Sequence, residues 1–275
     1  MSSVFALALL ALVSCSDEPA APPKPPPPPV APAPPPPPPP AADAAKPADE
    51  VLVPSPAQVA AALKDAGITA DVEKLVAKGT ITVTAENKDE VAVRTGVQLA
   101  YLVLTAKTAP KPATLARLEA AKAGFAAMGA GSDISKTIDE LAERIRNDAL
   151  NSDDLVVELD QLSRVLVPEV SYEAGPRCVP LIQAGSWLAG TNVVSGAIDA
   201  SGKPEAATKL LKHPEVVKYF LKYTETEGQA VAPPMIMAKL KVSLEKLSEV
   251  ANKDVVGAED VKAVYVTTGE VLGLL

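Results

Sequence analysis

Side chains suited to catalysis or metal binding are scarce in this chain of 275 residues. It has one histidine, His213, and two cysteines, Cys15 and Cys178. A structural zinc site takes four ligands, usually cysteine or histidine, and Ser-His-Asp or Cys-His catalysis needs a histidine beside the nucleophile. His213 directly precedes Pro214, which favours a helix end or a turn over a catalytic role. We therefore expect no metal site, no cofactor and no enzymatic activity, with an enzyme that uses carboxylates alone as the alternative.

Aromatic residues and net positive charge are also lacking. Phe, Trp and Tyr make up 3% of the chain, and the formal net charge is −8. The core must therefore be built mainly from Ala, Leu, Val and Ile, which favours closely packed helices over an aromatic-rich β-sandwich. The sequence has no basic patch with interleaved aromatic residues, so we expect no nucleic-acid partner.

Proline, in contrast, is abundant and unevenly placed, because 19 of the 28 prolines lie between Pro19 and Pro56. Residues 16–50 cannot form a packed core, and we expect them to be a disordered tether rich in polyproline II conformation. At about 3.1 Å per residue, such a tether would reach at most roughly 100 Å. A passive linker is the favoured interpretation, and a PxxP ligand for a partner with a binding groove is the alternative.

The chain begins with an apolar run from Val4 to Val13. This run has the length of the central region of a secretory signal and is too short to span a bilayer. The residues that close it, Leu12, Val13, Ser14 and Cys15, resemble the lipobox of bacterial lipoproteins, which are cleaved before the cysteine and acylated on it. The resemblance implies a lipoprotein signal peptide over 1–14, lipidation of Cys15, and a membrane partner held through the N-terminal acyl chains. An ordinary signal peptide with a chance cysteine is the alternative.

Lipidation of Cys15 predicts a location in the cell envelope. By analogy with lipoprotein sorting, Ser16 after the cysteine favours the outer membrane, facing the periplasm, although Asp17 follows it. Acylation of Cys15 also leaves Cys178 without an intramolecular disulfide partner. We interpret Cys178 as a buried apolar side chain, with an intermolecular disulfide or a reactive thiol as alternatives.

From residue 51 onward the sequence predicts one all-α domain, 51–275. Leu155, Leu159, Leu162 and Leu166 recur at i, i+4, i+7 and i+11, a spacing typical of a helix with one buried face. We expect a single bundle of about eight to ten helices after a disordered N-terminal segment, joined by short connections. Residues 79–87 alternate in a strand-like manner but have no evident partner strand, so we interpret them as a connector.

The ends of several helices follow from capping residues. Ser55 with Pro56 predicts a helix start, and Gly67 predicts its end. Pro112 predicts a second start, either Ser132 or Ser135 a third, and Ser152 a fourth, whose helix we expect to stop at Pro168. Further helices are expected at 88–107, 178–198, 204–212, 214–225, 233–252 and 259–272.

The segment 178–198 contains no charged residue. A membrane span is one interpretation, but polar residues around the helix and its glycines favour a central helix buried within the bundle. Small residues four apart, Gly185 and Ala189, would allow a neighbouring backbone to approach closely. Its polar and aromatic side chains make this segment the candidate for a ligand or partner groove, formed by Gln183, Trp187 and Asn192.

Three stretches resemble, in order and spacing, an uncharacterised family of helical, mostly lipidated envelope proteins of Gram-negative bacteria. They are VLVPSPAQVAAALKDAGI, TGVQLAYLVL and LIQAGSWLAGTN. The resemblance covers most of residues 51–198 and implies a helical fold and membrane anchoring, but it supplies no mechanism. We expect a lipid-anchored, non-enzymatic binding or scaffold module with an unknown envelope protein as partner, or alternatively a carrier of a small apolar ligand or lipid in a helical cavity.

Overall fold

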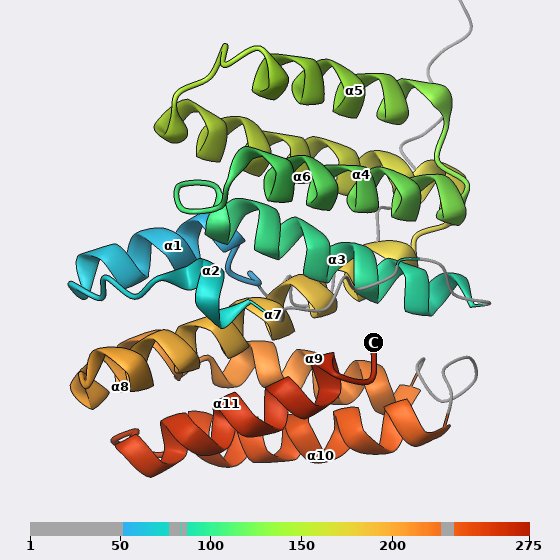
Figure 1. Ribbon diagram of the computed structural model, residues 1–275. Helices are drawn as coiled ribbons and strands as arrows, with labels where there is room; N and C mark the ends of the chain where they lie inside the picture. Colours follow the sequence, from blue (N-terminus) through green and yellow to red (C-terminus); the bar gives the residue numbers. More distant parts are fainter. Residues whose placement is uncertain (1–51, 77–82, 84–86, 227–233) are drawn as a thin grey trace, which may run out of the picture. The chain divides into compact units, whose positions relative to one another are not determined.

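The computed structural model describes residues 52–76, 83, 87–226 and 234–275, all within one compact unit, Asp49–Leu275. The expected signal peptide, Cys15 and the tether lie outside the described residues, as does most of the connector expected at 79–87. The described residues form eleven α-helices and no strand, which confirms the expected all-α multi-helix bundle (Figure 1).

The helices agree closely with the ranges expected from the sequence, and a short helix, α2, is added to them. Their bounds are α1 Pro56–Asp65, α2 Val72–Leu75, α3 Lys88–Thr105, α4 Lys111–Met128, α5 Ser132–Arg146, α6 Ser152–Ala174, α7 Cys178–Ser201, α8 Ala207–Leu211, α9 Pro214–Thr226, α10 Pro234–Ala251 and α11 Ala258–Leu272. A short 3-10 turn, Pro204–Ala206, precedes α8.

The centre of the unit is the crossing of α3 and α7 (Figure 1). Their backbones touch, because a β-carbon on Gly96 would lie 1.9 Å from the Ile182 carbonyl oxygen, and one on Gly185 would lie 2.0 Å from the Val93 carbonyl oxygen. Side chains larger than hydrogen cannot occupy either position at this distance. The expectation that Gly185 permits close packing is confirmed.

Helix α7 contributes to three hydrophobic clusters, which accounts for the absence of charged residues over 178–198. Its first part packs with α3 to α6 through Ile182, and its middle packs with α3 and α11 through Leu188 and Val193. Its last part packs with α8 to α11 through Val194 and Ile198. The segment expected at 178–198 is thus a buried central helix. In the part of the chain that the structure describes, no helix is both long enough and apolar enough to cross a bilayer.

Helix α6 passes through Pro168 and ends at Ala174, so the prediction that Pro168 stops it is wrong. Proline removes one backbone hydrogen bond and crowds the preceding turn, at a cost of about 3 kcal/mol. Pro168 is exposed, however, while Val167 and Val170 continue the buried face. The Ser171 hydroxyl also donates to the Pro168 carbonyl oxygen at 2.6 Å. Burial of Val167 and Val170 on the inner face of α6 therefore outweighs the hydrogen bond lost at Pro168 on its outer face.

Two of the expected N-caps are also wrong. Helix α5 is capped by Gly131 with Ser132 as its first residue, and α6 is capped by Asn151, whose side chain accepts from the backbone amides of Asp153 and Asp154 at 2.9 Å. Asn151 immediately precedes the expected cap Ser152, and both are favourable capping residues, so the local pattern was ambiguous.

The start of α1 is confirmed in detail. Ser55 and Gln58 form a reciprocal capping box, and Gly67 ends the segment with φ +65°, a conformation that favours glycine. Polar contacts then fasten the α1–α2 segment to the bundle: Lys203 donates to the Gly67 carbonyl oxygen at 2.7 Å, and Glu73 of α2 pairs with Arg117 of α4 through two hydrogen bonds of 2.8 and 2.9 Å.

Candidate functional site

The three residues expected to share a groove lie in different environments. Trp187 and Asn192 are 7% and 6% exposed and belong to the interior, whereas Gln183 is partly exposed beside a surface groove. The structure therefore does not bring the three side chains together. Of the three, only Gln183 is positioned to meet a ligand.

Trp187 is a packing residue. Its ring lies 5.2 Å from the ring of Phe220 in α9, tilted by 32°, and both side chains belong to the cluster around α8 to α11. An offset or tilted arrangement is favourable for two aromatic rings at this distance. Trp187 thus joins α7 to α9 within the core.

Asn192 joins α7 to α11. Its side-chain nitrogen donates to the Tyr265 carbonyl oxygen and to the Thr268 hydroxyl oxygen, both at 2.9 Å. Thr268 in turn donates to the Val264 carbonyl oxygen at 2.7 Å. Because the Asn192 donor is used within the core, this residue has a structural role.

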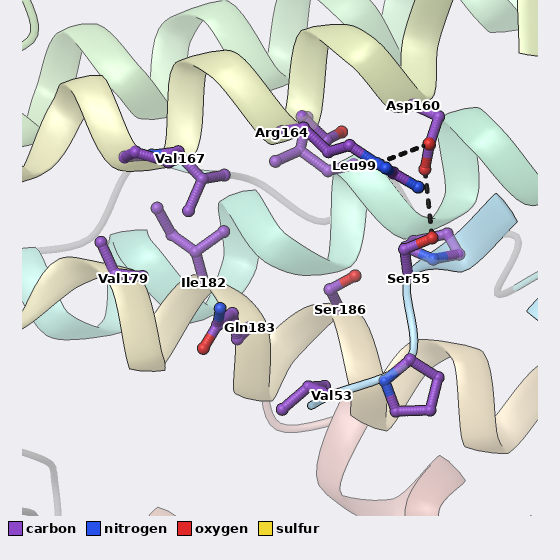
Figure 2. Close-up of a pocket in the computed structure, with 14 residues that line it drawn as sticks. Val53, Ser55, Leu99, Asp160, Arg164, Val167, Val179, Ile182, Gln183 and Ser186 are labelled. Carbon is purple, nitrogen blue, oxygen red and sulfur yellow. Dashed lines mark hydrogen bonds and ion pairs between the residues drawn. The ribbon is translucent and has the colours of Figure 1, made fainter. Parts of the chain in front are cut away.

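Gln183 lines a groove between the start of α1, α6 and α7 (Figure 2), named here the Gln183 groove. It has a volume of about 290 Å³. Its lining combines apolar side chains with polar side chains on two opposite sides, and consists of Val53, Pro54, Ser55, Pro56, Leu99, Asp160, Ser163, Arg164, Val167, Pro168, Val179, Ile182, Gln183 and Ser186.

One polar side of the Gln183 groove is organised around Asp160. The Ser55 hydroxyl donates to Asp160 at 3.1 Å, and the Arg164 Nε lies 2.8 Å from the other carboxylate oxygen. The Asp160 side chain is 14% exposed, against 63% for Arg164. The Asp160 carboxylate therefore interacts with protein partners, while most of the Arg164 side chain is exposed to solvent.

Across the groove, α7 presents Gln183 and Ser186 (Figure 2). Within the described residues, neither side chain makes a hydrogen bond to the protein. A carboxamide both donates and accepts, so Gln183 can pair with a peptide group or with any ligand that carries both functions. Apolar walls with a few polar groups that converge are typical of binding sites.

A second groove runs along α1 where it faces α3, and it is named here the Lys64 groove. Its volume is about 390 Å³. Alanines contribute much of the lining, and two lysines lie on it; the full set is Ala57, Ala60, Ala61, Leu63, Lys64, Ile68, Ala70, Val72, Val103, Leu104, Lys107, Thr108, Val156 and Ala197.

The sequence reasoning missed the Lys64 groove, although a signal for it was present. Ala57, Ala60, Ala61 and Lys64 follow at i, i+3, i+4 and i+7, so they share one face of α1. A helix face made of alanines leaves unfilled space between that helix and the helix that packs on it. Here a lysine stands at the end of the face. The pattern shows the face but not its partner, which only the structure identifies as α3.

The two remaining residues with reactive side chains are Cys178, which is buried, and His213, which is partly buried. Cys178 is 6% exposed, and burial raises the pKa of its thiol, which confirms the interpretation as a buried apolar side chain. His213 lies in the connection between the end of α8 at Leu211 and the start of α9 at Pro214, as the expectation of a helix end or a turn allows. Burial lowers the pKa of His213, and a hydrogen bond to the Leu210 backbone partly offsets this.

Acidic residues do not gather into a metal site in the described ranges. The acidic run at Asp153 and Asp154 lies in the first turn of α6, where carboxylates are favoured by the helix dipole. Among the described residues, no group of three or more His, Cys, Asp or Glu side chains is placed to hold a metal ion.

The lipidation site Cys15 and the lipobox residues Leu12, Val13 and Ser14 lie outside the described residues. The lipobox interpretation and the resemblance to lipidated envelope proteins therefore stay predictions from sequence. Comparisons of the chain with models of protein families, with curated proteins and with solved structures found no match.

Proposed function

We propose that this protein is a bacterial lipoprotein whose helical domain binds an envelope protein in the periplasm and performs no catalysis. In this proposal Cys15 carries the acyl chains, and residues 16–50 hold the helical domain at a distance from the outer membrane. The lipobox-like sequence, the proline-rich segment and the scarcity of catalytic side chains support it.

The observation that carries the binding role is the Gln183 groove. It combines apolar walls, among them Leu99 and Ile182, with the Gln183 carboxamide, the Ser186 hydroxyl and the largely exposed side chain of Arg164. Burial of the walls would supply affinity, and the polar groups would fix the register of an extended peptide segment. The groove adjoins Ser55, close in sequence to the tether, so a partner bound there would be held near the tethered end of the domain.

The anchor is tested by replacement of each cysteine in turn. We expect Cys15→Ala to abolish labelling by radioactive palmitate in cells and to release the protein from the membrane fraction. Cys178→Ala is the matched control, because it removes the other thiol and should leave labelling and fractionation unchanged. Labelling that persists in Cys15→Ala would overturn the anchor.

The binding role is tested with a photoreactive amino acid placed at position 183 in cells. We expect a specific crosslinked product from position 183 that is weakened by Arg164→Ala. The control position is Val266 on α11, which is 57% exposed but lies outside the groove. Equal products from both positions, or none from position 183, would contradict the proposed binding surface.

The second candidate is a carrier of a small apolar ligand. The observation that favours it is the Lys64 groove, whose alanine lining leaves about 390 Å³ between α1 and α3. This volume falls in the range of small-molecule pockets, roughly 300–1,000 Å³. The two candidates use different grooves and can be tested separately.

A further inference from the structure

The Lys64 groove exists because the facing side chains are too short to fill it. Helix α1 presents Ala57, Ala60 and Ala61 toward Val103 and Leu104 of α3. Protein interiors are packed as densely as organic crystals, and space between two helices is normally filled by larger side chains. Leucine is nearly as good a helix former as alanine, so the helical conformation of α1 does not require alanine at these positions. The groove therefore leaves apolar surface that a ligand can cover.

The mouth of this apolar groove carries positive charge. Lys64 and Lys107 both line it, and Asp153 forms an ion pair with Lys107. The pKa of Asp153 is lowered, chiefly by the hydrogen bond from Lys107. Electrostatic attraction to Lys107 and Lys64 lowers it further. Within the described residues, the Lys64 side chain makes no hydrogen bond or ion pair at contact distance. Two cations against one carboxylate leave one positive charge unmatched, in a chain whose formal net charge is −8.

We propose that the Lys64 groove binds a single-chain amphiphile with an anionic head. The hydrocarbon chain lies between α1 and α3 against the alanine face, and the head pairs with the Lys64 ammonium group at the mouth. Apolar burial supplies the affinity, whereas the lysine selects the sign of the head group. This inference rests on the second candidate function, the carrier, and gives it a ligand class. It is independent of the Gln183 groove.

The test uses residues 15–275 carrying Cys15→Ala, so that no acyl chain of the protein itself can occupy the groove. Three probes with the same ten-carbon chain are titrated by calorimetry below their micelle concentrations: decanoate, decyl phosphate and decyltrimethylammonium. We expect one molecule of either anion to bind per chain and the cation to bind more weakly. The tighter of the two anions distinguishes a free fatty acid from a phosphorylated lipid as the natural source.

Two variants locate the binding site. Lys64→Met should weaken binding of the anions by about fivefold, the size of a surface ion pair, and strengthen binding of the cation, because the repulsion by the ammonium group is removed. The matched control is Lys218→Met, which removes the same charge from the exposed surface of α9 and should change neither. Ala60→Leu fills the groove and should abolish binding of all three probes. If Ala60→Leu does not fold, Ala61→Leu at the mouth gives the same test.

The outcomes separate this inference from the proposed functions. The proposal of an anionic ligand would be overturned if the cation bound as tightly as the anions, or if Lys64→Met and Lys218→Met weakened binding of the anions equally. Either result would still be compatible with a carrier of an apolar ligand. Absence of binding by all three probes would overturn this inference together with the carrier. The crosslinking result at position 183 is unaffected by either outcome, because that position lies in the other groove.

Discussion

Gly185 of α7 lies directly against the backbone of Val93 in α3, so close that a β-carbon at position 185 would stand 2.0 Å from the Val93 carbonyl oxygen. The partner is backbone rather than the end of a flexible side chain, so it cannot move aside without displacing a helix. Both grooves are lined partly by α3 and α7, which makes this crossing the base on which they are built.

The close approach predicts opposite effects for two glycines of the same helix. Gly185→Ala should lower the free energy of unfolding by about 3 kcal/mol, because the new methyl group forces α3 and α7 apart. Gly190→Ala is the control, since its β-carbon would meet only Val59 at 3.9 Å. It should be neutral or stabilising by up to about 1 kcal/mol, through the better helix propensity of alanine.

Chemical denaturation of the two glycine variants, followed by circular dichroism, checks the prediction. Equal midpoints for Gly185→Ala and Gly190→Ala would mean that α3 and α7 can separate freely at the crossing.

Asn192→Ala should destabilise the docking of α11. The substitution removes two hydrogen bonds and leaves the Tyr265 carbonyl oxygen without this donor, so we expect a loss of about 1–3 kcal/mol in the free energy of unfolding. Ser201→Ala is the matched control, because the Ser201 hydroxyl donates only to Ile198 in its own helix. A loss in Asn192→Ala no larger than in the control would argue against Asn192 as the link between α7 and α11.

His213 predicts a stability that depends on pH. Burial lowers its pKa in the folded state, so between that value and the unfolded pKa of about 6.5 the unfolded chain binds more protons. The free energy of unfolding should therefore rise with pH through this window, be fully established above about pH 6.5, and fall on acidification below it.

The pH dependence is measured from urea denaturation at several values between about pH 5.5 and 7.5, where ordinary carboxylates are almost fully ionised. Because His213 is the only histidine in the chain, His213→Gln should remove most of the slope. A variant that keeps the slope of the parent protein would assign it to another group.

Cys178 should be unreactive until the domain unfolds. Its exposed fraction is 6%, and its raised pKa keeps the thiol protonated at neutral pH. In residues 15–275 carrying Cys15→Ala, we expect labelling by a maleimide reagent to be negligible in buffer and complete in concentrated urea. Rapid labelling of the native protein would instead indicate a thiol open to disulfide exchange with a partner.

Local sequence was sufficient to predict most helices, because hydrophobic periodicity and capping residues act over a few neighbouring residues. The leucine repeat at 155, 159, 162 and 166 predicts α6, and the Ser55–Gln58 pair begins α1 where expected. The end of α6 was missed because Pro168 is a local signal, whereas burial of Val170 against the bundle is a tertiary one. The rule that proline ends a helix considers only neighbours in sequence, so it does not include the free energy gained by burying Val170.

The candidate site was less predictable for the same physical reason. On a regular helix Gln183 and Trp187 lie about 40° apart, and Gln183 and Asn192 about 180° apart. The environment of each residue depends on which helix packs on its face of α7. Helix α9 covers Trp187, and α11 accepts the hydrogen bonds from Asn192. Gln183 lies at a groove. Similarly, the alanine face of α1 becomes a groove only because α3 lies opposite it.

The sequence by itself determined the helical class, most helix boundaries, the buried character of 178–198 and the expectation of an anchor at Cys15. These follow from periodicity, capping and short motifs, which act over a few residues. The tertiary structure alone decided which faces are covered and which stay open, because that depends on helix partners far apart in the chain. It separated the three expected site residues, extended α6 beyond Pro168, and placed Lys64 at the mouth of an unfilled groove.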